Sequence, residues 1–183
     1  MRIIAGEYRS RILKTLEGNN TRPTLDKIKG AVFSKFNNNI YDSIFLDLFS
    51  GSGSIGIEAI SRGAKLVIFN DINNNAYNII NYNINNLNIS NYELYKLDYK
   101  LLINKLDYKF NYIYLDPPFN NINYDELLEY ISNSNIMNNN CYIIVESLVD
   151  ILLKDNYNKL VKIKDAKYGK IKITYYIYNI DGE

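Results

Sequence analysis

The sequence contains no histidine, no tryptophan and a single cysteine among its 183 residues. The absence of histidine excludes histidine bases, histidine metal ligands and every mechanism of the Ser-His-Asp or Cys-His type. One cysteine excludes an intramolecular disulfide and any zinc or iron–sulfur site built from several cysteines. We therefore expect no metal site, and a large share of hydrolase and metalloenzyme chemistry is excluded.

Long apolar runs are also missing from the chain. No stretch approaches the ~20 apolar residues that a membrane-spanning helix needs, so we expect no membrane contact. Met1 is followed by Arg2 and two isoleucines rather than by an apolar leader, which favours a cytoplasmic location. The chain is long enough for one domain with a sizeable core, and we expect a monomer.

Positive charge is concentrated near the N-terminus. Residues 1–35 hold eight basic and three acidic side chains, a net charge of +5, so the rest of the chain carries −4 of the total of +1. A basic arm on a slightly acidic body predicts contact with a polyanion, although charge alone is explained equally well by a solvated surface. We divide the chain into a basic N-terminal extension (1–40) and a main domain (41–183).

Apolar periodicity predicts a regular alternation of strands and helices from residue 44 onward. The expected strands cover 44–49, 66–69, 92–97, 112–115 and 141–146, the expected helices cover 55–62, 73–87, 101–106 and 124–132, and a hairpin of 160–164 and 171–178 closes the chain. Within the extension we expect a short hairpin around Gly6 and a helix over 25–37 capped by Thr24. This order predicts a mostly parallel sheet with helices on both faces and a ligand site at the carboxyl ends of its strands.

The loop after the first of these strands has the pattern of a nucleoside-binding loop. Gly51, Gly53 and Gly56 form G-x-G-x-x-G between a strand and a helix. Asp71 follows Gly51 by 20 residues, at the end of the second strand, where an acid that binds a ribose is expected. Asp47 would repel the pyrophosphate of a dinucleotide, but it would attract the ammonium and sulfonium groups of S-adenosylmethionine. The loop therefore favours S-adenosylmethionine over NAD as the cofactor.

Other side chains at the same edge of the sheet are candidate cofactor contacts. Asp98 ends the third strand, where it can accept a hydrogen bond from the adenine amino group or, equally well, cap the helix that follows. Phe49 and Tyr99 could flank the cofactor or belong to the core. The candidate cofactor-binding residues are Asp47, Phe49, Gly51, Ser52, Gly53, Asp71, Ile72 and Asp98.

The loop after the fourth expected strand reads Asp116-Pro117-Pro118-Phe119, and these four residues are the candidate catalytic set. The two prolines fix φ and hold Asp116 outside the helical region, which gives a stiff turn. The exocyclic amine of a nucleobase is a poor nucleophile because its lone pair is delocalised into the ring. A fixed carboxylate and a fixed carbonyl can accept its N–H bonds and aim the nitrogen at an electrophilic methyl group. Phe119 can stack on the base.

Several segments together resemble the RsmD family. They are residues 2–6, 11–13, 21–24, 47–64 and 167–169, so the resemblance covers nearly the whole chain. It implies a Rossmann-like, seven-stranded sheet of the class I S-adenosylmethionine-dependent methyltransferases, mostly parallel with an antiparallel last strand, after a small extension that contacts RNA. It also implies methyl transfer to the N2 amine of a guanine in 16S rRNA, in the small ribosomal subunit or its assembly precursor.

Under this resemblance the candidate RNA contacts are Arg2, Arg9, Arg11 and Arg22. The chain also departs from the family pattern at two places. Ser10 stands where the family usually has glycine, which would alter the hairpin. Lys29 and Gly30 replace a usual Arg-Glu pair, which would weaken the helix and one ion pair. Both changes bear on RNA affinity rather than on methyl transfer.

Two other functions remain open from the sequence. An Asp-Pro-Pro-Phe loop serves adenine as well as guanine, so a DNA adenine-N6 methyltransferase is one alternative. The short chain offers no further domain for reading a DNA sequence, which favours RNA recognised by shape. The other alternative is a non-catalytic RNA-binding assembly module, which would use the basic arm but would leave Asp47, Asp71 and Asp116 unexplained.

Overall fold

The structure is a computed structural model that describes residues 1–16, 22–118 and 122–179. Its strands are β1 (Ile44–Asp47), β2 (Leu66–Asn70), β3 (Tyr92–Tyr95), β4 (Phe110–Leu115), β5 (Met137–Leu148), β6 (Asn156–Tyr157), β7 (Leu160–Tyr168) and β8 (Ile171–Tyr178). Its helices are α1 (Arg22–Phe36), α2 (Ser54–Ser61), α3 (Asn74–Asn86), α4 (Tyr99–Lys105) and α5 (Tyr124–Ser132), with a 3-10 turn η1 (Asn37–Ile40) after α1. None of the helices in these described ranges has the length and apolar character needed to cross a lipid bilayer.

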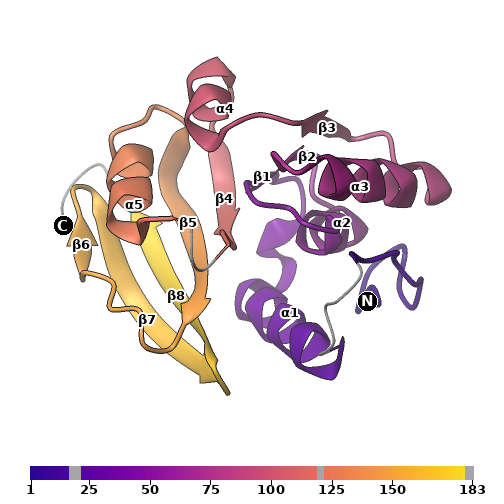
Figure 1. The fold of residues 1–183 in the computed structure, drawn as a ribbon, viewed down its shortest axis with the longest axis horizontal. Helices are drawn as coiled ribbons and strands as arrows, with labels where there is room; N and C mark the ends of the chain where they lie inside the picture. Colours follow the sequence, from indigo (N-terminus) through magenta and orange to yellow (C-terminus); the bar gives the residue numbers. More distant parts are fainter. Residues whose placement is uncertain (17–21, 119–121, 180–183) are drawn as a thin grey trace.

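All the strands belong to one sheet with the order β3-β2-β1-β4-β5-β8-β7-β6 (Figure 1). The first five strands run parallel, and β8 pairs antiparallel with both β5 and β7. The expectation of a mostly parallel sheet with an antiparallel last strand is therefore confirmed. The described residues form eight strands rather than the expected seven, because the two-residue β6 pairs with β7 at the edge of the sheet. Two residues are too few to show an alternation pattern, so sequence periodicity cannot detect this strand.

Two parts of the N-terminal extension differ from the sequence expectation. Helix α1 begins at Arg22 rather than after Thr24. Pro23 lies in the first turn, where its fixed φ suits a helix and its missing N–H is not needed. The hairpin around Gly6 has an isolated bridge between Arg2 and Ile12 and further backbone hydrogen bonds, such as Ile3 N–H to Arg11 O at 3.0 Å, rather than two regular strands.

Side chains along the central strands alternate between two layers of helices. In β1, Phe45 packs in a cluster with α1, α2 and α3, whereas Leu46 packs in a second cluster with α4 and α5. The same alternation places Tyr114 of β4 and Ile144 of β5 in the first cluster. Positions 47, 116 and 146 lie two residues further along their strands, so we expect their side chains on the face that α1, α2 and α3 cover.

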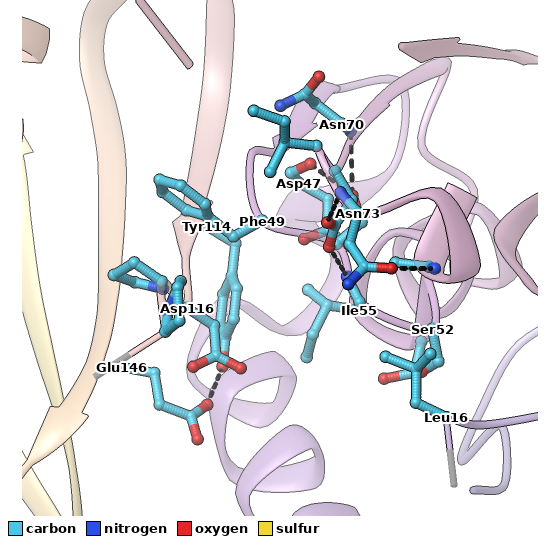
Figure 2. Close-up of a pocket in the computed structure, with 18 of the residues that line it drawn as sticks. Leu16, Asp47, Phe49, Ser52, Ile55, Asn70, Asn73, Tyr114, Asp116 and Glu146 are labelled. Carbon is cyan, nitrogen blue, oxygen red and sulfur yellow. Dashed lines mark hydrogen bonds between the residues drawn. The ribbon is translucent and has the colours of Figure 1, made fainter. Parts of the chain in front are cut away.

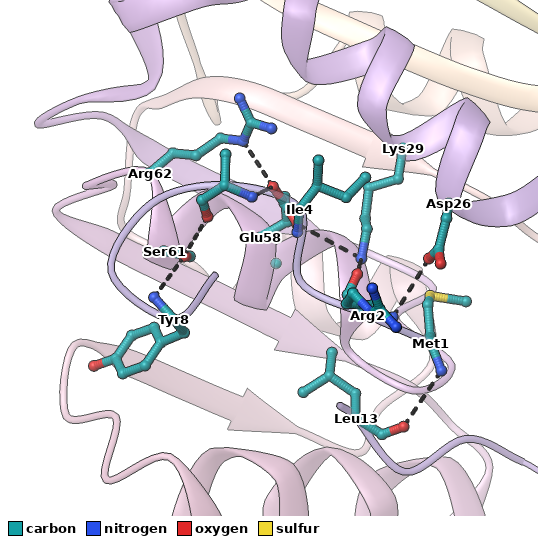
Figure 3. Close-up of polar contacts among 12 residues, drawn as sticks. Met1, Arg2, Ile4, Tyr8, Leu13, Asp26, Lys29, Glu58, Ser61 and Arg62 are labelled. Carbon is teal, nitrogen blue, oxygen red and sulfur yellow. Dashed lines mark hydrogen bonds and ion pairs between the residues drawn. The ribbon is translucent and has the colours of Figure 1, made fainter. Parts of the chain in front are cut away.

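The N-terminal extension shares the core of the main domain. Ile3 and Leu13 are buried and belong to the same apolar cluster as Phe33 of α1 and Ile57 of α2. Polar contacts add to this packing. Tyr8 donates its backbone N–H to the Ser61 hydroxyl at 3.0 Å (Figure 3). The extension is therefore packed against α2 rather than attached as a separate arm.

A buried carboxylate on α2 fixes the extension to the main domain. Glu58 is fully buried and accepts the backbone N–H groups of Ile4 at 2.8 Å and Ala5 at 3.1 Å. It also forms ion pairs with Arg62 at 2.9 Å and with Lys29 of α1 at 3.6 Å (Figure 3). We call these five residues the Glu58 cluster. Lys29, which replaces the usual arginine of the family, thus forms an ion pair in this protein.

Gly30 gives a prediction about the stability of α1. A Cβ atom at this position would lie 3.5 Å from Ile4 Cδ1, which is an ordinary contact. We expect Gly30→Ala to raise the free energy of unfolding by about 0.5–1 kcal/mol, because alanine loses less conformational entropy in a helix. Equilibrium urea denaturation measures the change. Gly56→Ala is the control with the opposite sign, since its Cβ would lie 2.2 Å from the Phe69 ring. A loss of stability in the Gly30 variant would contradict this account of α1.

Candidate functional site

A cavity of about 1090 Å³ lies at the carboxyl ends of β1, β2 and β4 (Figure 2). Both loops identified in the sequence open into it. The predicted site residues that line it are Asp47, Phe49, Gly51, Ser52, Asp71, Ile72, Asp98, Asp116, Pro117 and Pro118. Another part of the wall comes from the N-terminal extension, through Met1, Leu16, Ile28 and Lys29. The fold thus brings together segments that lie more than a hundred residues apart in the chain.

The other predicted residues are not among those that line this wall. Gly53 is the N-cap of α2, with φ of 75°, and a Cβ there would meet Ile80 at 3.3 Å. It therefore shapes the turn from behind the cavity. Phe119 lies outside the described residues, as does the side chain of Arg22, whose backbone begins α1. Of the other candidate RNA contacts, Arg2, Arg9 and Arg11 are exposed on the N-terminal extension.

Hydrogen bonds to two acids hold the glycine loop in place. The backbone N–H of Gly51 donates to Asp71 Oδ2 at 2.8 Å, and Asp71 Oδ1 accepts from the backbone N–H of Asn73 at 2.9 Å. Asp47 Oδ2 accepts from the backbone N–H of Gly56 at 2.9 Å. The loop between β1 and α2 is therefore tied to the ends of β1 and β2. Gly56 is required here because the Phe69 ring packs against it. A Cβ atom at position 56 would lie 2.2 Å from Phe69 Cε1.

Asp47, at the start of the glycine loop, is buried, with an exposed fraction of 1%. Burial raises the pKa of Asp47 to about 7, and the nearby charge of Asp71 adds to the rise, whereas the hydrogen bond from Gly56 opposes it. A carboxyl group with this pKa is partly protonated at neutral pH. A positively charged ligand beside it would favour the ionised form.

Asn70 connects the segments that follow β1 and β3, and it was not identified as a site residue from the sequence. Asn70 is buried at the end of β2, and its Nδ2 donates to the backbone oxygens of Leu48 at 3.2 Å and Leu97 at 3.0 Å. Its Oδ1 accepts from the Leu97 N–H at 3.0 Å. Asn70 thereby joins the segments that leave β1 and β3. The sequence did contain a signal for this residue, because Asn70 is a polar residue at the end of an otherwise apolar strand.

Asp98 and the aromatic pair lie on the wall next to this connection. Asp98 caps α4 by accepting the backbone N–H of Lys100 at 2.9 Å, and it also lines the cavity. The cap is thus present, and the cavity position leaves room for a ligand contact as well. Phe49 and Tyr99 both line the cavity with ring centroids 6.0 Å apart. Together with the exposed Ile72 they give this end of the cavity an apolar surface.

The opposite end of the cavity carries a pair of carboxyl groups, Asp116 and Glu146. Burial and the charges of Glu146 and Asp47 raise the pKa of Asp116 well above its usual range. Glu146 is 5% exposed, and its Oε2 accepts from the Tyr114 hydroxyl at 2.6 Å (Figure 2). Burial raises the pKa of Glu146, whereas this hydrogen bond opposes the rise. Glu146 was missed as a site residue, although an acid near the end of the strand beside the Asp-Pro-Pro strand was visible in the sequence.

These residues fit a cationic nucleoside better than a nucleotide with phosphates. Three acids, Asp47, Asp71 and Asp98, lie around the glycine loop. Lys29 is the one lysine or arginine on the described wall, and it is paired with Glu58. A phosphate group would therefore meet net negative charge, whereas an ammonium or sulfonium group would meet acids. The donor set agrees with S-adenosylmethionine.

Sequence comparison finds relatives among bacterial proteins. The chain is 46% identical over 71 residues to YlbH, a candidate rRNA methyltransferase of Bacillus subtilis, a match that covers 39% of this chain and 39% of YlbH. It is 44% identical over 78 residues to ribosomal RNA small subunit methyltransferase D of Haemophilus influenzae, covering 43% of this chain and 40% of that protein. The chain thus spans about two fifths of the length of these curated relatives.

Comparison of structures covers the whole fold. The yhhF protein of Escherichia coli, a candidate methyltransferase, superimposes with a TM-score of 0.88 over 98% of both chains at 24% sequence identity. This likeness confirms the fold expected from the sequence, a mostly parallel, Rossmann-like sheet with an antiparallel last strand. The model of the family described as conserved hypothetical protein 95 matches residues 1–177. The chain therefore belongs to this family, the RsmD family that its sequence motifs resemble.

Proposed function

We propose that this protein transfers a methyl group from S-adenosylmethionine to the exocyclic N2 amine of a guanine in 16S rRNA, within the small ribosomal subunit or its assembly precursor. The observation that carries the proposal is that the glycine loop and the Asp116-Pro117-Pro118 corner line one cavity. A donor at one end and a base at the other would then meet inside it. The name of the Haemophilus relative supports small-subunit rRNA as the substrate. We further propose a monomeric, cytoplasmic enzyme that needs no metal ion.

At the donor end, each acid has a distinct role in the proposal. S-adenosylmethionine supplies an electrophilic methyl group on a positively charged sulfur. Asp71 would accept hydrogen bonds from the ribose hydroxyls through lone pairs that Gly51 and Asn73 leave free, and Asp98 would accept a hydrogen bond from the adenine amino group. Asp47 attracts the positive charge of the donor. The backbone groups of Gly51 and Ser52 would be available for hydrogen bonds with the donor, and Gly53 keeps the turn in shape. Phe49 and Ile72 would pack against the adenine.

At the base end, the stiff corner orients the amine. The Asp116 carboxylate and a backbone carbonyl of the Pro117-Pro118 turn accept the two N–H bonds, and Phe119 stacks on the base. The lone pair of the nitrogen would then face the donor end of the cavity. S-adenosylmethionine would supply the methyl group, and Asp116 or water would take the proton that the nitrogen loses on methylation. No histidine is required for this step.

The basic extension supplies the RNA contacts in this proposal, through Arg2, Arg9, Arg11 and Arg22. We expect the double charge reversal Arg9→Glu with Arg11→Glu to weaken RNA binding and to lower the slope of log K against log salt concentration by roughly two, because about one counterion per lost phosphate contact is no longer released. Filter binding over a range of salt concentrations measures both. Lys154→Glu is the control, since the segment before β6 lies at the opposite end of the molecule (Figure 1). Equal affinity of the double variant and the parent at low salt would remove the extension from RNA binding.

Donor binding should depend on pH through Asp47. Because the pKa of Asp47 is raised to about 7, the carboxyl group is largely protonated below that pH and ionised above it. A cationic donor prefers the ionised form, so we expect its affinity to rise as the pH increases from 6 to 8. Isothermal titration calorimetry measures this, and Asp47→Asn should flatten the dependence. A profile that is the same in parent and variant would assign the titration to another group.

A methylation assay tests the proposed function as a whole. The protein is incubated with radiolabelled S-adenosylmethionine and small ribosomal subunits that lack the modification, and the nucleosides are then identified by mass spectrometry. We expect labelled N2-methylguanosine in 16S rRNA. In a parallel incubation with DNA, label in N6-methyladenine would support the DNA methyltransferase instead. A protein that does not bind the donor in calorimetry would be an RNA-binding assembly module.

A further inference from the structure

The position of Glu146 next to Asp116 gives the cavity a second carboxyl group at the base end. Leu115 of β4 pairs in parallel register with Val145 of β5, so Asp116 and Glu146 are the next residues on two neighbouring strands. Strands in a sheet lie about 4.8 Å apart, and side chains at paired positions leave the sheet on the same face. Both residues line the cavity, and Figure 2 shows their carboxyl groups side by side near the Tyr114 hydroxyl.

Glu146 is nearly buried, and one of its carboxyl oxygens is held by a hydrogen bond within the protein. Its Oε2 accepts from the Tyr114 hydroxyl at 2.6 Å. No other side-chain or backbone donor in the described part of the chain bonds to its carboxylate, and no lysine or arginine there forms an ion pair with Glu146 or Asp116. No fully buried polar side-chain atom in the described ranges lacks a hydrogen-bond partner, so Oε1 is open to the cavity. A molecule bound there can donate a hydrogen bond to it.

The two amino-purines differ in the atom next to the reactive amine. In guanine, the ring atom N1 beside the 2-amino group carries a hydrogen and donates. In adenine, the ring atom N1 beside the 6-amino group has a lone pair and accepts. If Asp116 holds the amine, a carboxylate beside it accepts from guanine N1–H. The same carboxylate would face the lone pair of adenine, which is repulsive.

We propose that Glu146 is the specificity-determining residue of this site, and that its Oε1 accepts the ring N–H beside the exocyclic amine, so that guanine is methylated and adenine is rejected. This inference rests on the proposed function and adds the group that distinguishes the two bases. Tyr114 is a positioning residue, because its hydroxyl holds Oε2 and leaves Oε1 toward the cavity.

The test uses a substrate that keeps the amine and lacks only the ring N–H. The guanine that the enzyme methylates is first mapped and then replaced by 2-aminopurine in a ligated small-subunit RNA. We expect the parent to prefer guanine over 2-aminopurine by roughly 10- to 100-fold in kcat/KM, as for one charge-assisted hydrogen bond. In Glu146→Gln the Tyr114 hydroxyl still has an amide oxygen to bond, and the amide NH2 then faces the cavity. We expect the preference to fall to within a few-fold or to reverse.

A ratio of two substrates on one protein is insensitive to a partly unfolded preparation. Glu129→Gln, an exposed carboxylate on α5, is the matched control and should keep the parental ratio. Tyr114→Phe is the second variant if Glu146→Gln does not fold, and it should lower the ratio by 2- to 10-fold with donor affinity unchanged. If the Glu146 or Tyr114 variant prefers guanine over 2-aminopurine as strongly as the parent does, the inference is overturned and the proposed function stays intact. A parent that methylates no RNA would overturn both.

Discussion

Replacing Asp116 by alanine is expected to lower kcat for methyl transfer by roughly 10²–10³, because one hydrogen bond that forms fully only in the transition state is lost. Donor affinity should stay within a few-fold of the parent, since Asp116 lies at the base end of the cavity. Single-turnover methylation of small subunits measures the first quantity, and calorimetry with S-adenosylmethionine measures the second. Asp116→Asn keeps an oxygen acceptor at the same place, so it should lose less activity than Asp116→Ala.

The control for this prediction is Asp107→Ala, an exposed aspartate before β4 that does not line the cavity. It should keep the activity of the parent. Unchanged turnover in Asp116→Ala would show that the aspartate serves only the turn. A parallel loss of donor affinity and turnover would instead place Asp116 at the donor.

The second large effect is expected on stability, at Glu58. Glu58→Ala should lower the free energy of unfolding by roughly 3–5 kcal/mol, because it leaves the buried Lys29 without its ion pair and the N–H groups of Ile4 and Ala5 without an acceptor. That is a large part of the 5–15 kcal/mol by which proteins are usually stable. Urea denaturation followed by circular dichroism measures the loss.

Glu126→Ala is the matched control for the Glu58 variant. Glu126 pairs with Lys100, but both side chains are exposed, so the expected loss of stability is much smaller than in the Glu58 variant. Limited proteolysis of the Glu58 variant should cleave first within residues 1–16, since the extension loses its polar attachment to α2. A Glu58 variant as stable as the control would mean that apolar packing of Ile3 and Leu13 alone holds the extension.

The elements that the sequence predicted well share a physical cause. Strands β1, β2 and β4 are short apolar runs between turn residues, and the expected helix over 124–132 coincides with α5 because Asn123 caps it and its apolar residues share one face. The glycine loop and the proline corner were equally visible. Few other residues allow those backbone conformations, so their positions in the chain carry the information.

Other features depend on contacts that are distant in the sequence. Nothing near Glu58 or Lys29 in the chain indicates that the two meet, since the pair forms only when α1 packs on α2. The bridge made by Asn70 between Leu48 and Leu97 likewise exists only across three neighbouring strands. Sequence periodicity assigns a side chain to a face, but it does not say which residue lies opposite.

The order of strands and helices, the glycine loop, the Asp-Pro-Pro corner and the family could all be read from the amino-acid sequence, because each is encoded in consecutive residues with narrow conformational preferences. The tertiary structure alone decided that both loops line one cavity, that the N-terminal extension forms part of its wall, and that Glu146 stands beside Asp116. These depend on the register of β4 against β5 and on the packing of α1, which arise from the sum of many long-range contacts rather than from any local pattern.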